Sequence, residues 1–103
     1  MVAEAELERW LAAHTAAAPV TLRERVLEHV RAVGDGGTVA ERLALAAERV
    51  LAIVEEHPGD RGIALDLLAA DAIITLALLA QAEAAPERLG AFAEGLLAAE
   101  RAG

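Results

Sequence analysis

The segment 61–84 is apolar on every side of a helix apart from Asp66 and Asp71, and this feature most constrains how the chain can fold. A helix without a polar face has to be covered by other elements. The remaining helical segments are therefore expected to pack around it. This predicts an all-α protein, a compact bundle of four to five helices packed around a central hydrophobic helix, about 61–84.

The same segment has to be tested as a membrane span. On the insertion scale each central Asp costs about 3 kcal/mol, whereas each Leu or Ile returns only about 0.5 kcal/mol. The nine Leu and Ile residues between Ile63 and Ala80 do not outweigh two Asp residues on this scale. We therefore interpret the segment as the core helix of a soluble protein, with no membrane partner.

Four further segments show the spacing of three and four residues that is typical of amphipathic helices. They cover 3–17, 21–33, 38–57 and a segment that begins at Pro86. With 103 residues, the chain is expected to form a single helical domain, 1–103.

Helix ends are marked by residues that satisfy free backbone N–H groups. Thr21 with Glu24, and Thr38 with Glu41, each have the spacing of a capping box. Asp60 is expected to cap the central helix. The third helix has a charged side, including Arg42 and Arg49, that is expected to face solvent.

The composition excludes several classes of partner. The net charge of −8 argues against nucleic acid, which needs a basic surface, and against anionic membrane surfaces. An acidic N-terminal segment without an apolar signal region favours a cytoplasmic protein. The chain is 56% apolar but has only Trp10 and Phe92 as aromatics, so its core consists of small and aliphatic side chains that suit closely packed helices.

The sequence also lacks much of the usual catalytic equipment. It contains no Ser, Cys, Lys, Tyr or Asn, which removes the common nucleophiles and Schiff-base lysines. The three His lie on three segments without zinc-ligand spacing, so we expect no metal and no cofactor. This restricted alphabet suits a GC-rich or thermophilic source, or an engineered chain.

Asp71 is the polar residue that is hardest to explain structurally. At 100° per residue it shares its helix face with Leu67, Ile74, Thr75 and Leu78, and only Thr75 is polar. If this face is covered, Asp71 is a desolvated carboxylate with a raised pKa, suited to act as a general base or as a ligand anchor. The alternative is a structural hydrogen bond, either to a neighbouring helix end or across a dimer axis.

Asp66 lies about 140° away from Asp71 on the same helix, among small residues. We expect an Arg from a neighbouring helix to pair with it. Two residues of the first helix, Trp10 and His14, fall on its apolar side one turn apart. They are either ordinary boundary residues or the wall of a ligand pocket.

Two functions follow from these observations. The surplus of apolar surface favours a small interaction or assembly module that self-associates as a homodimer. The alternative is a binder of a small apolar ligand, or a simple acid–base catalyst. In that case Asp71 is the base, with Thr75 and His14 as catalytic neighbours. The ligand would contact Trp10, Leu67, Ile74, Leu78 and Asp66.

Overall fold

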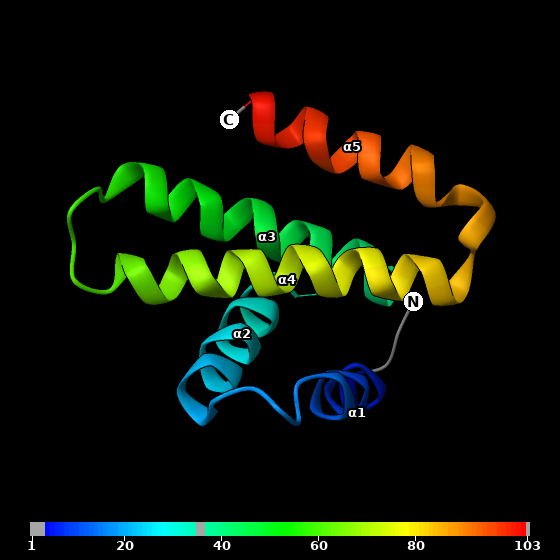
Figure 1. The fold of residues 1–103 in the computed structure, drawn as a ribbon, viewed down its shortest axis with the longest axis horizontal. Helices are drawn as coiled ribbons and strands as arrows, with labels where there is room; N and C mark the ends of the chain where they lie inside the picture. Colours follow the sequence, from blue (N-terminus) through cyan, green and yellow to red (C-terminus); the bar gives the residue numbers. More distant parts are fainter. Residues whose placement is uncertain (1–3, 35–36, 103) are drawn as a thin grey trace.

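Helices α3 (Val39–Glu56) and α4 (Ile63–Ala84) lie side by side and antiparallel, and the other helices are arranged around this pair (Figure 1). The computed structural model describes residues 4–34 and 37–102. All regular secondary structure among these residues is helical, which confirms the predicted all-α bundle. The predicted loop after the second helix includes residues 35–36, which lie outside the described ranges.

The N-terminal and C-terminal helices lie on opposite edges of the α3–α4 pair (Figure 1). α1 (Glu4–His14) and α2 (Val20–Ala32) lie at one edge and run across the direction of the pair. The short 3-10 helix η1 (Pro86–Arg88) follows α4 and turns the chain into α5 (Leu89–Ala102), which runs along the other edge. α4 contacts α2, α3, η1 and α5, so it is the central helix that the sequence predicts.

The contact between α3 and α4 is the most extensive in the bundle, and it is built largely from alanine. The buried apolar residues of α4 are Ala69, Ala70, Ile73, Leu76, Ala77 and Ala80. Those of α3 include Ala40, Leu43, Ala46, Ala47 and Val50. Small side chains let two helix axes approach to the shorter end of the usual packing distance. The alanine-rich composition therefore produces one tight helical hairpin.

α1 and α2 complete the core with larger side chains. Leu7 and Leu11 of α1 are buried, as are Val26 and Val30 of α2. These residues lie at spacings of four, so each helix presents one apolar side to the α3–α4 pair. The short N-terminal helices thus cover the part of the core that the hairpin leaves open.

Arg42 is buried, with 1% of its surface exposed, although its position in the sequence indicates the solvent side of α3. Its guanidinium donates to both carboxylate oxygens of Glu4, at 2.5 and 3.0 Å, and to the Val30 carbonyl at 3.4 Å. These bonds join α1 and the end of α2 to α3. The two bonds to Glu4 also hold the pKa of its carboxyl below its usual value, so their contribution to stability is present at neutral pH and is lost as the pH falls through that pKa.

The Thr38 half of one predicted capping box is confirmed, and the other box is wrong. The Thr38 side chain accepts a hydrogen bond from the Glu41 backbone N–H at 3.1 Å, as expected. Thr21 does not cap α2, because the helix already begins at Val20 after Pro19. The proline ring fixes φ of Pro19, here −57°, and its ψ of 145° keeps this residue outside the helix, which begins at the next residue without a side-chain cap.

Two other predicted helix ends shift by a few residues. α1 ends at His14 instead of residue 17, and the Thr15 hydroxyl donates to the Leu11 carbonyl just beyond its end. Asp60 does not cap α4 directly. Its carboxylate accepts from the Gly62 N–H at 3.1 Å in the turn that precedes the helix.

Among the described residues, α4 alone has the length and apolar composition that would allow it to cross a membrane. The core helices of soluble proteins pass the same test, so this property by itself is weak support for a membrane span. The compact bundle in which α4 lies is consistent with a soluble protein.

Candidate interaction surface and polar clusters

One side of α4 faces away from the bundle, so the prediction that this helix is covered all round is wrong. Leu68, Leu67 and Leu79 are exposed by 58%, 48% and 39%. The other helices pack against one side of α4, and this side carries all of its buried residues. Among residues 4–34 and 37–102, no helix covers the opposite side.

We define the outer stripe of α4 as the residues along this uncovered side. They are Ala64, Leu67, Leu68, Asp71, Thr75, Leu78, Leu79 and Ala82. Leu78 and Ala82 are half-buried and the others are exposed. Apart from one carboxylate and one hydroxyl, the outer stripe is apolar. Contiguous apolar surface of this kind on a small protein commonly marks an interaction site.

Asp71 lies in the middle of the outer stripe and is exposed, so the prediction of a buried aspartate is wrong for the single chain. Thr75 is also exposed, and its hydroxyl donates to the Asp71 backbone carbonyl at 3.0 Å, not to the carboxylate. Within the described residues, no hydrogen bond or ion pair reaches that carboxylate. An exposed carboxylate lacks the desolvation on which a general-base role depends.

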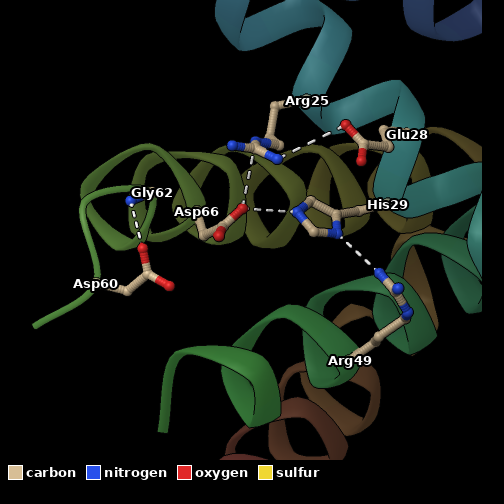
Figure 2. A network of polar contacts seen from close by, with 7 residues as sticks. All are labelled: Arg25, Glu28, His29, Arg49, Asp60, Gly62 and Asp66. Carbon is tan, nitrogen blue, oxygen red and sulfur yellow. Dashed lines mark hydrogen bonds and ion pairs between the residues drawn. The ribbon is translucent and has the colours of Figure 1, made fainter. Parts of the chain in front are cut away.

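Asp66 lies on the buried side of α4, with 8% of its surface exposed, and it belongs to a polar network (Figure 2). Its Oδ1 lies 2.9 Å from Nε2 of His29 and 3.4 Å from Nε of Arg25. On the far side of the imidazole ring, Nη1 of Arg49 lies 2.8 Å from His29 Nδ1 (Figure 2). The predicted pairing of Asp66 with an arginine from another helix is confirmed.

The hydrogen-bond geometry assigns the tautomer of His29. A guanidinium can only donate, so Nδ1 of His29 accepts from Arg49. The hydrogen of the neutral ring is then on Nε2, which donates to Asp66. Both ring nitrogens of His29 are used in this way and His29 is 5% exposed, so the Asp66–His29 pair has no free ring nitrogen for proton transfer to a ligand. The network joins α2, α3 and α4.

A second polar cluster forms around Glu83, near the end of α4. Trp10 Nε1 donates to Glu83 Oε1 at 3.0 Å, and His14 Nε2 lies 3.3 Å from Glu83 Oε2. The indole and imidazole rings stack with their centroids 4.0 Å apart. Nδ1 of His14 lies 2.8 Å from the Trp10 carbonyl. Both ring nitrogens of His14 therefore face oxygen atoms.

Trp10 also lines an open cleft of about 830 Å³ between α1, α3, α4 and α5. The cleft walls include Val39, Phe92, Glu41, Glu83 and Arg88. Both aromatic residues of the chain are thus at this cleft, although the sequence indicates only Trp10 as a pocket wall. Phe92 was not identified because its pocket neighbours come from other helices.

The residues proposed for one ligand site lie in three places. Asp71 and Thr75 share the outer stripe with Leu67 and Leu78, and Ile74 is half-buried beside it. Asp66 belongs to the buried network. Trp10 and His14 meet α4 at Glu83, which is twelve residues beyond Asp71, or about 18 Å along the helix axis. The structure therefore does not bring Trp10 and His14 to Asp71.

No group of three or more side chains suited to bind a metal ion lies within the part of the chain that the structure describes. No family model, characterised protein or solved structure matches the chain. Fold and surface together define it as a small all-α bundle in which one apolar helix side is left uncovered.

Replacement of Asp66 by Ala should destabilise the fold. It removes the acceptor of His29 and the counterion of Arg25, so the free energy of unfolding should fall by about 2 kcal/mol in urea denaturation. Glu48→Ala, which removes an exposed carboxylate from α3, is the matched control and should change stability by less than about 0.5 kcal/mol. Equal losses in both variants would contradict a structural role for the network.

Proposed function

We propose that the protein is a small helical assembly module that forms a homodimer through the outer stripe of α4. The observation that carries this proposal is the exposure of Leu67, Leu68 and Leu79 on one side of a single helix. Complete burial of a leucine side chain is worth about 1.5–3 kcal/mol. A second copy would cover three such side chains on each chain at once.

The composition of the outer stripe supports a second copy over other partners. Its side chains are Ala and Leu with one Asp and one Thr, so the surface is well suited to pack against itself. A basic partner would find a single carboxylate there, and an anionic lipid surface would be repelled by a chain of net charge −8. That charge also opposes dimerisation, but physiological salt screens most of the repulsion, since the Debye length there is about 8 Å. We expect such an acidic, soluble module to act in the cytoplasm.

Replacement of Leu68 by Glu should abolish the dimer. Light scattering of the wild type at micromolar concentration should give twice the chain mass of 10.7 kDa, and Leu68→Glu should give the chain mass with unchanged helix content by circular dichroism. Leu68 is 58% exposed, so the charge is tolerated in the monomer but not between two copies.

The matched control is Leu45→Glu, which places the same charge on an exposed leucine of α3. It should leave the mass at that of a dimer. A monomeric wild type, or equal dissociation by both variants, would refute the proposed assembly role.

The cleft beside Trp10 favours a second candidate function, the binding of a small apolar ligand. Its volume of about 830 Å³ is large enough for a drug-sized molecule, and two aromatic rings line it. Carboxylates and one guanidinium at its walls could orient polar groups of that ligand. Asp71 has no part in this candidate function, because it lies on the outer stripe.

Filling the cleft should block this binding. The neutral dye N-phenyl-1-naphthylamine should gain fluorescence with the wild type, and Ala84→Phe should weaken its affinity about tenfold because Ala84 lines the cleft. Ala98→Phe, at an exposed position of α5 outside the cleft, should bind as the wild type does. Equal binding by all three proteins would place the dye elsewhere and remove the support for a cleft ligand.

A further inference from the structure

We infer that two copies pair antiparallel along α4, with the Asp71 carboxylate of each chain accepting a hydrogen bond from the Thr75 hydroxyl of the other. This inference rests on the proposed dimer and specifies its geometry. It is carried by the spacing and order of the residues along the outer stripe.

The outer stripe has the spacing of a coiled-coil seam. Its central positions are 64, 68, 71, 75, 78 and 82, which follow one another at intervals of four, three, four, three and four residues. This is the heptad pattern by which one helix side packs continuously against another helix. The opposite side of α4 has a separate buried set of residues, so the heptad positions are not required by the monomer core.

The order of side chains in the outer stripe is nearly the same when read in either direction from position 73. Ala64 mirrors Ala82, and Leu68 mirrors Leu78. In a twofold-symmetric dimer the same patch of both chains meets itself, so residue i contacts residue j and j contacts i. For antiparallel helices centred at position 73, alanine would meet alanine and leucine would meet leucine.

The one polar pair follows the same symmetry. Asp71 mirrors Thr75, so each carboxylate of an antiparallel dimer would face a hydroxyl of the other chain. The Thr75 hydroxyl now donates to a backbone carbonyl of its own helix at 3.0 Å. Threonine in a helix divides between two side-chain rotamers, so this hydroxyl can be redirected to the carboxylate.

Other arrangements leave the carboxylate without a donor. A parallel pair would place Asp71 directly against Asp71 of the other chain, and like charges in close contact are unfavourable. An antiparallel pair shifted by one heptad would place Asp71 against a leucine or an alanine of the outer stripe. The pairing of Asp71 with Thr75 therefore selects both the orientation and the register, as single polar residues do in coiled coils.

The distance between spin labels tests the orientation. The sequence has no cysteine, so Ala64→Cys provides a single labelling site on the exposed side of α4. In the antiparallel dimer the two nitroxides should be separated along the axis by the span from position 64 to 82, about 27 Å. Equimolar Ala64→Cys and Ala82→Cys chains should add a short distance near the interhelix spacing of about 10 Å.

The outcomes of this experiment separate the two proposals. A dimeric mass with the long distance supports both. A dimeric mass with a short distance in Ala64→Cys alone would overturn the antiparallel arrangement and leave the dimer in place. A monomeric mass of the unlabelled wild type would overturn the proposed function, and the arrangement with it.

The substitution Thr75→Val tests the hydrogen bond itself. Valine has the shape of threonine but cannot donate, so each Asp71 carboxylate would lose its donor and the dimer should dissociate about tenfold more readily in analytical ultracentrifugation. Thr21→Val, at an exposed position of α2, is the matched control and should leave the dissociation constant unchanged. Unchanged or tighter dimerisation of Thr75→Val would contradict the pairing. If Thr75 made no hydrogen bond across the interface, its replacement by the more apolar valine would leave the dimer unchanged or strengthen it.

Discussion

The close contact between α3 and α4 is the interaction on which the rest of the structure depends. Alanines on the facing sides of both helices, such as Ala47 and Ala77, let the two backbones approach. This contact decides which side of α4 is buried, and therefore where each of its two carboxylates lies. Asp66 is turned toward α2, and Asp71 is turned outward. The opposite environments of the two residues therefore both follow from the packing of α3 against α4.

Asp66 and Asp71 show two ways in which a carboxylate on an apolar helix avoids an uncompensated loss of solvation. Burial of a carboxylate requires compensating donors. Asp66 obtains them from His29 and Arg25 on α2, and Arg49 on α3 completes the network by fixing the tautomer of the ring. Asp71 keeps its solvation because nothing in the bundle covers it. The same residue becomes costly as soon as another surface is placed over the outer stripe, unless that surface brings a donor.

The sequence predicts the structure correctly where local chemistry decides the outcome. The helical class, the Thr38 cap and the arginine partner of Asp66 follow from periodicity, from capping geometry and from the cost of an unpaired charge. The sequence does not predict which sides of α4 are covered, because that depends on how many helices are available to cover them. The pattern of 61–84 shows that both sides of the helix are apolar, but it does not say that only one is covered. His29 could have been recognised from its place between Val26 and Val30 on the buried side of its helix. The burial of Arg42 depends on α1, and no pattern within α3 indicates it.

The residue types that the sequence lacks favour antiparallel pairing. Neutral hydrogen-bond donors on side chains come mainly from Ser, Thr, Asn, Gln, Tyr and Trp. Ser, Asn and Tyr are absent from the chain, and Thr75 is the only one of these donors in the outer stripe. A second copy can therefore satisfy Asp71 from the outer stripe in one way, with Thr75 opposite Asp71. Twofold symmetry then forms the same bond twice. An outer stripe of leucine and alanine alone would bind more tightly but would allow either orientation and several registers. In the dimer that we propose, Asp71 reduces the number of ways in which two copies can fit together.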